Sequence, residues 1–215
     1  MGWQSVRFKA QWGFSMQRRK FWNVACIALA FGAAPALAQV GGTNGEKFLN
    51  AVRDVDGGRA TELLEGNGST VLSYRGAKGE TALNIVARRR DATWLGFLIA
   101  RGADANVGDD RGETPLLIVS RLGWAEGAAI LLRYGARVDG ANRLGETPLI
   151  VAVQGRQTSL VRQFLEAGAN PDKRDAAAGY SARDYASRDS RSSDLLKVIE
   201  TIKPTKKSIS GPIFK

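Results

Sequence analysis

The chain has 215 residues, 44% of them hydrophobic and 24% charged, which is typical of a folded protein with one core or a short repeat array. It carries a net charge of +10, no histidine and one cysteine, Cys26. The lack of imidazole excludes Ser-His-Asp triads, Cys-His pairs and His-ligated zinc, and a lone cysteine excludes an intrachain disulfide.

Residues 1–38 have the three-part pattern of a secretory signal peptide. Five basic side chains and no acid are followed by an apolar run at 24–34, by Pro35 and by the small residues that end at Ala38. The apolar run is shorter than the roughly 20 residues that span a bilayer as a helix, so a permanent anchor is the weaker alternative. We expect residues 1–38 to be a cleavable signal peptide cut between Ala38 and Gln39, with Met16 as a second candidate start.

Export would change the charge and the redox chemistry of the chain. Because the leader holds five basic residues and no acid, its removal leaves a net charge of +5 and no cysteine. A chain without thiols suits an oxidising bacterial envelope, so we expect a periplasmic protein. Residues 18–21, Arg-Arg-Lys-Phe, match the core of a twin-arginine signal. Paired arginines are also common in basic leaders, so the general secretory route is favoured and the twin-arginine route is the alternative.

Two sequence markers recur downstream with the same period. Gly-Glu-Thr occurs at 79–81, 112–114 and 145–147, which gives two equal spacings of 33. Gly-Ala occurs at 102–103, 135–136 and 168–169, with the same two spacings. Two independent markers with one period predict an array of structural repeats.

Each repeat has the signals of two short helices. Thr114-Pro115 and Thr147-Pro148 are typical helix starts, since the hydroxyl caps free N–H groups and proline is tolerated at the first helical position. A second apolar helix, for example around 130–132, ends before a glycine at position 135 that can adopt the left-handed conformation. Neither helix could bury its apolar face alone, so neighbouring repeats must stack.

The segments Gly102-Ala103-Asp104-Ala105-Asn106 and Gly112-Glu113-Thr114-Pro115-Leu116 resemble the ankyrin-repeat family. The resemblance implies an all-α repeat solenoid, in which stacked helix-turn-helix repeats are joined by β-turn or hairpin loops. We expect a degenerate N-terminal repeat at 45–77, three ankyrin repeats at 78–110, 111–143 and 144–176, a C-terminal capping repeat at 177–203 and a flexible tail at 204–215.

One position departs from the family pattern. The family usually places a histidine after Thr-Pro-Leu, where it links adjacent turns, and this chain has Asn84, Leu117 and Ile150 there. We expect apolar packing to replace the polar network between repeats.

The resemblance also implies a function. Family members generally bind other proteins on the concave face formed by the turn tips and first helices, and have no chemistry of their own. Carried over by position, the partner-binding residues are Lys78, Glu80, Arg88, Arg89, Asp110, Arg111, Glu113, Arg121, Leu122, Trp124, Arg143, Leu144, Glu146 and Tyr180. This mixed but positively biased face would fit a partner with acidic groups around an apolar centre.

Several of these residues have a structural explanation as well. Arginines 88–90 can be a solvated helix end that meets the negative pole of the helix dipole. Trp124 is equally compatible with core packing and with partner contact. Asp109 and Asp110 fit a turn stabilised by side-chain-to-backbone hydrogen bonds better than a catalytic or calcium-binding pair.

Two other function classes compete with protein binding. An envelope-associated binder of anionic lipid, lipopolysaccharide or cell wall could use the net positive charge and the basic residues around 203–207. An enzyme is disfavoured, because no nucleophile motif, phosphate-binding loop or metal-ligand spacing occurs. We expect no cofactor, no metal, no nucleic-acid partner and a monomeric mature chain.

Overall fold

The computed structural model describes residues 43–189 and 193–202. The predicted signal peptide, its cleavage site at Ala38 and Gln39, and the predicted tail at 204–215 lie outside these described residues. Within them, no helix is long and apolar enough to cross a membrane.

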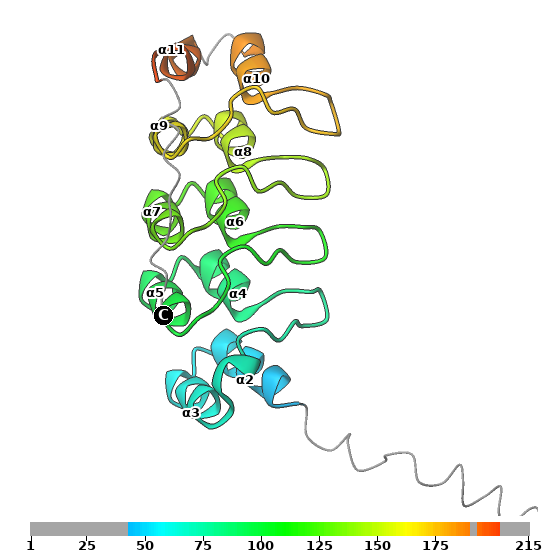
Figure 1. The fold of residues 1–215 in the computed structure, drawn as a ribbon, viewed down its shortest axis with the longest axis vertical. Coiled ribbons are helices and arrows are strands. Elements are labelled where there is room, and N and C mark those ends of the chain that lie inside the picture. Colours follow the sequence, from blue (N-terminus) through cyan, green and yellow to red (C-terminus); the bar gives the residue numbers. More distant parts are fainter. Residues whose placement is uncertain (1–42, 190–192, 203–215) are drawn as a thin grey trace, which may run out of the picture. The chain divides into compact units, whose positions relative to one another are not determined.

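Five pairs of antiparallel helices follow one another in the described part of the chain (Figure 1). The first helices of the pairs stack in one layer, the second helices stack in another, and long loops project beyond the first layer. This architecture is the predicted all-α repeat solenoid. The pairs are α2 (Asn44–Arg53) with α3 (Gly57–Asn67), α4 (Ala82–Arg89) with α5 (Ala92–Ala100), α6 (Pro115–Arg121) with α7 (Ala125–Arg133), α8 (Pro148–Gln154) with α9 (Thr158–Glu166), and α10 (Ala182–Arg188) with α11 (Ser193–Thr201). A short 3₁₀ helix, η1 (Gly68–Thr70), lies in the longer connection after α3.

The predicted helix starts are confirmed. Thr114 and Thr147 each accept a hydrogen bond from the backbone N–H three residues on, and a proline occupies the first position of α6 and α8. The start of α4 lacks this proline but has a reciprocal capping box between Thr81 and Asn84. Asn84 therefore compensates locally for the missing proline.

The turns between the two helices of a pair require a left-handed residue. Gly123 meets this need in the α6–α7 turn, whereas Arg90 and Arg156 adopt φ values of 57° and 54° in the corresponding turns. A non-glycine residue is disfavoured in this region. Both arginines offset that cost by reaching the next helix pair: Arg90 donates to the carbonyl of Leu122, and Nε of Arg156 donates to Asp189 at 2.7 Å.

The core runs without interruption between the two helix layers. Apolar side chains from every pair contribute to it, and Phe48 in α2 and Phe164 in α9 are fully buried. Burying one such side chain stabilises the fold by about 1.5–3 kcal/mol. Because each helix pair shares its core with its neighbours, the loops that project from the array are held at a fixed spacing.

Candidate functional site

One buried side chain holds each of the last three loops in shape. Oδ1 of Asp109 accepts hydrogen bonds from the backbone N–H groups of Arg111 (2.9 Å) and Glu113 (3.0 Å). Oδ1 of Asn142, one repeat later, does the same for residues 144 and 146, and Asp175 does so for residues 178 and 179. The turn interpretation of Asp109 is thereby confirmed. Asn142 and Asp175 were missed, although the repeat period points to both.

Backbone hydrogen bonds join neighbouring loops at their tips. The N–H of Asp110 donates to the carbonyl of Lys78 (3.0 Å), that of Arg143 to Arg111 (3.0 Å) and that of Ala176 to Leu144 (2.8 Å). Because these bonds recur between each two neighbouring loops from residue 78 to residue 176, they set these loops in register. Equivalent tip side chains of successive loops therefore follow one another in the order of the repeats.

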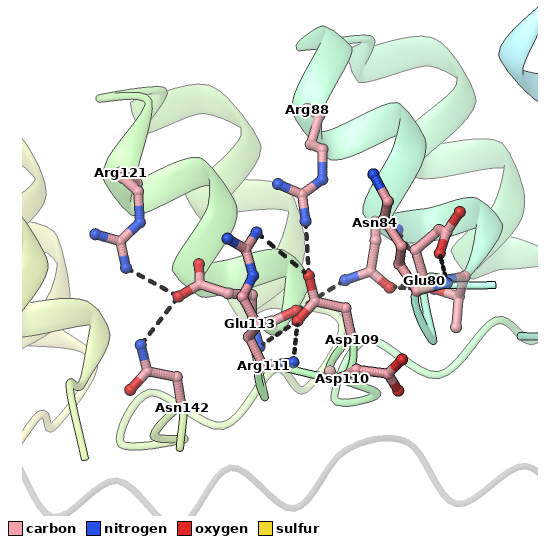
Figure 2. A network of polar contacts seen from close by, with 12 residues as sticks. Glu80, Asn84, Arg88, Asp109, Asp110, Arg111, Glu113, Arg121 and Asn142 are labelled. Carbon is pink, nitrogen blue, oxygen red and sulfur yellow. Dashed lines mark hydrogen bonds and ion pairs between the residues drawn. The ribbon is translucent and has the colours of Figure 1, made fainter. Parts of the chain in front are cut away.

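Below the tips, arginines of the first helices bind carboxylates of the loops (Figure 2). Arg88 in α4 contacts Oδ2 of Asp109 at 2.8 Å, and Arg121 in α6 contacts Glu113 at 2.9 Å and Glu146 at 3.1 Å. We call this set of side chains the polar layer. It consists of Arg53, Glu80, Asn84, Arg88, Asp109, Glu113, Arg121, Asn142 and Glu146.

Glu113 lies at the centre of the polar layer. Glu113 is only 7% exposed. Its Oε1 accepts hydrogen bonds from Arg121 and from Nδ2 of Asn142, both at 2.9 Å. Its backbone carbonyl accepts a further bond from Nδ2 of Asn84 at 3.0 Å (Figure 2). A single residue thus connects three consecutive helix pairs.

The expectation that apolar packing replaces the network between repeats was wrong at one of the three positions. Leu117 and Ile150 are fully buried apolar residues, as expected. Asn84, in contrast, bonds across to the loop of the next pair. The physical reason is that an asparagine amide has donors left after capping its own helix, whereas leucine and isoleucine have none.

Hydrogen bonds in the polar layer favour the charged forms of Glu80 and Arg121. Burial raises the pKa of Glu80, but hydrogen bonds from backbone N–H groups and from Arg53 outweigh burial and hold this pKa below its ordinary value. Burial lowers the pKa of Arg121, and the hydrogen bonds to Glu113 and Glu146 outweigh it and raise this pKa. At the C-terminal end, the Tyr185 hydroxyl donates to Asp175 at 2.6 Å, which raises the pKa of Tyr185.

The structure corrects several predicted partner-binding residues. Trp124 is only 9% exposed and its ring lies over Gly127, so it is a core residue and no surface anchor. Arg89 donates to the carbonyl of Val52 and to Asp91, and it links α4 to its own turn and to α2. Glu113 is buried. These three residues are therefore engaged in contacts within the fold.

Other predicted residues also have partners inside the chain. Glu80 binds Arg53 at 2.5 Å, and Arg88, Arg121 and Glu146 belong to the polar layer. Leu122 is partly buried, and its carbonyl is the one that Arg90 contacts.

Tyr180 is partly buried as well. Arg188 stacks over its ring, with the guanidinium carbon 4.2 Å from the ring centroid, and the ring of Tyr185 meets it edge-on. Tyr180 is therefore held by its neighbours in the last helix pair rather than presented to solvent as an anchor.

Exposed side chains lie at the loop tips, beside the buried Asp109, Asn142 and Asp175. We call the exposed side chains at positions 75–78, 108–111, 141–144 and 174–177 the hairpin tips. From the predicted set they contain Lys78, Asp110, Arg111, Arg143 and Leu144, all exposed. Arg75 and Arg174, also exposed, were missed. The regular repeat spacing from Arg75 through positions 108 and 141 to Arg174 was the available signal.

This face combines charged groups that pair with one another and charged groups that are exposed. Among the described residues, no group of three or more His, Cys, Asp or Glu side chains could hold a metal ion. The charged groups of the polar layer bind one another, and the hairpin tips present side chains outward.

Comparison with known proteins agrees with this architecture. Residues 83–175 match a family model described as ankyrin repeats in three copies. No curated protein is significantly similar to the chain. Ankyrin repeats generally mediate protein–protein interactions and are typically non-enzymatic. Residues 83–175 of the chain are therefore ankyrin repeats.

Proposed function

We propose that this protein is exported to the bacterial periplasm and binds a protein partner through its hairpin tips. The observation that carries the proposal is the separation of charge between two levels of the same loops. The carboxylates of Asp109, Glu113 and Glu146 are held in the polar layer, with side-chain exposures of 5%, 9% and 16%. The basic side chains at the tips are exposed.

This separation makes the tips more basic than the sequence of the loops implies. The hairpin tips present five exposed basic side chains, Arg75, Lys78, Arg111, Arg143 and Arg174, and one exposed acid, Asp110. Among them, Leu144 is an exposed apolar side chain, with 56% of its surface open. A partner with acidic groups around one apolar contact complements this arrangement.

Photo-crosslinking in intact cells tests the partner face. A crosslinking amino acid at position 144 should capture a partner, and one at Arg133, exposed on the second-layer helix α7, should not. The triple variant Lys78→Glu, Arg111→Glu and Arg143→Glu should lower recovery at least tenfold. Its matched control changes three exposed arginines of the second layer, Arg59, Arg133 and Arg162, to glutamate. Equal recovery from the two triple variants would rule out the hairpin tips.

The basic tips also favour the alternative of binding to anionic lipid, lipopolysaccharide or cell wall. Charge attraction between exposed groups weakens strongly as salt screens it, whereas a contact with an apolar centre persists. A salt series on binding to anionic vesicles and on recovery of the crosslinked partner separates the two functions. Binding to vesicles that disappears at moderate salt, with no protein crosslink from position 144, would favour the envelope binder.

Export is tested separately from binding. The leader pattern of residues 1–38 and the lack of cysteine after it support a periplasmic location. The mature protein should begin at Gln39 by mass spectrometry and should appear in the periplasmic fraction. A protein that keeps residues 1–38 and stays in the cytoplasm would contradict this part of the proposal.

A further inference from the structure

The second-layer helices differ in the charge they expose. Helices α3, α7, α9 and α11 each expose charged side chains: Arg59, Glu62 and Glu65; Glu126 and Arg133; Arg162 and Glu166; Asp194, Lys197 and Glu200. Helix α5, residues 92–100, contains no charged residue at all. Its outward surface therefore carries no charge of its own, and Arg101, directly after the helix, is a charged residue that lies against it.

This strip has the spacing of one helix face. Thr93, Gly96, Phe97 and Ala100 follow an i, i+3, i+4, i+7 pattern, and we call them the α5 outer face. Thr93 and Ala100 are exposed, and Gly96 and Phe97 are partly exposed. Arg101 and Trp94 lie against the ring of Phe97, at 4.6 Å and 5.1 Å from its centroid. At the centre of the face, no described side chain from elsewhere in the fold lies within 4 Å of the place that a Cβ of Gly96 would take.

Gly96 has no evident role in the described fold. Glycine inside a helix lowers stability relative to alanine, so it is normally found where a neighbour leaves no room for a Cβ. Gly127 in α7 is such a case, since a Cβ there would lie 2.3 Å from the ring of Trp124. A Cβ at Gly96 would meet no described atom within 4 Å. A segment lying on α5 would account for this notch.

We propose that residues 203–215 of this same chain cover the α5 outer face, with Ile213 and Phe214 in the notch over Gly96. The array allows the reach. Helices α11, α9, α7 and α5 contact one another in that order, and three steps of roughly 10 Å separate the first from the last. The stretch from Ile202 to Phe214 extends about 40 Å. Helix α3 lies one step further and is charged.

The composition of the segment suits that path. Lys203, Lys206 and Lys207 come first and would pass α9 and α7, where Glu126 is an exposed carboxylate. Ile213 and Phe214 come near its end, at the distance of the α5 outer face. Pro204 and Pro212 disfavour a helix and favour an extended chain, which gives the segment its reach.

Engineered cysteine pairs test this contact in the full chain carrying Cys26→Ser. One chain has Ala100→Cys with Ile213→Cys, and the matched chain has Arg162→Cys with Ile213→Cys. A free segment would crosslink more to position 162, because α9 is nearer to its root in α11. Docking predicts the reverse order, with at least fivefold more intrachain disulfide at position 100. A yield at 162 equal to or above that at 100 would overturn the proposal.

Two further variants identify what holds the segment. Phe214→Asp should reduce the yield at position 100 to the level of the α9 pair or below, while Ser210→Asp, a control with the same added charge, should leave it high. Disulfides between chains that increase with protein concentration would instead indicate pairing with a second copy and contradict an intrachain contact.

A stability measurement is independent of crosslinking. Gly96→Ala should raise the melting temperature by a few degrees in a chain lacking residues 203–215, because alanine favours the helix. In the full chain the methyl group would intrude on the docked segment, so the rise should be smaller or absent. The same rise in both chains would show that nothing occupies the notch.

Discussion

Asp109 and Asp110 are adjacent in the sequence but have different environments. The Asp109 side chain is 5% exposed and binds Arg88 and two backbone N–H groups, whereas that of Asp110 is 59% exposed and lies 3.7 Å from Arg75. The first belongs to the polar layer and the second to the hairpin tips. Formal charge therefore does not indicate which groups of this face are exposed to a partner, since neighbouring loop residues of the same charge can be buried or exposed.

The difference between the two levels has a physical basis. A buried carboxylate requires partners, and the loop geometry and the arginines of the first helices provide them. Ion pairs at the exposed tips gain little from Coulomb attraction in water. We therefore expect substitutions in the polar layer to change folding, and substitutions at the tips to change binding alone.

The largest effect should come from Glu113→Ala. Removing this carboxylate leaves the amide of Asn142 with one acceptor fewer and Arg121 with one ion pair fewer, so the free energy of unfolding should fall by about 2–3 kcal/mol. Urea denaturation measures this change. Arg143→Ala, an exposed tip residue on the next loop, is the control and should change it by less than about 0.5 kcal/mol. Similar losses for the two variants would remove the distinction between the levels.

Asp109→Ala should have the next largest effect. It removes both the loop hydrogen bonds and the contact with Arg88, and should destabilise by about 1–2 kcal/mol. Asp109→Asn should cost less than about 1 kcal/mol, since Asn142 shows that an amide oxygen supports the same loop. Thermal unfolding of the two variants separates the loop bonds from the ion pair. Equal losses would assign the whole effect to Arg88.

Acidification should lower the stability of the fold, because it protonates carboxylates that the folded state holds in their charged form. Asp175 and Glu80 have pKa values below their ordinary 3.8 and 4.5, because hydrogen bonds to the charged form outweigh burial. The unfolded chain then binds protons more readily, so stability is retained above these ordinary values and falls as pH decreases through and below them. The urea midpoint between pH 7 and pH 3 should fall less steeply in Glu80→Gln than in the parent chain. Parallel curves would contradict the assignment.

The smallest effect on folding is expected from the tips. Lys78→Glu, Arg111→Glu and Arg143→Glu together should shift the unfolding free energy by no more than about 0.5 kcal/mol, because these side chains are exposed. The far-ultraviolet circular dichroism should match that of the parent chain. A loss of several kcal/mol would show that the tips contribute to the fold, and the crosslinking comparison would then need single substitutions.

Much of the fold follows from local signals in the sequence. The Thr-Pro pairs set the starts of α6 and α8, and the regular period predicted stacked repeats. The resemblance to the family was carried by the segments 102–106 and 112–116. These signals act within a few residues or recur regularly, so no knowledge of distant contacts is needed to interpret them. The loop role of Asp109 was predicted for the same reason, because its hydrogen bonds are local.

Contacts between repeats decide which of the site residues are exposed to a partner and which are buried or paired. The sequence by itself determined the repeat, its helices and the positions that line the loops. Only the tertiary structure decided that Trp124 is core, that Asn84 bonds to the neighbouring loop, and that Arg88 and Arg121 are bound by carboxylates of the loops. The burial and pairing of these side chains arise when one helix pair packs on the next, and a pattern within one repeat does not specify that contact.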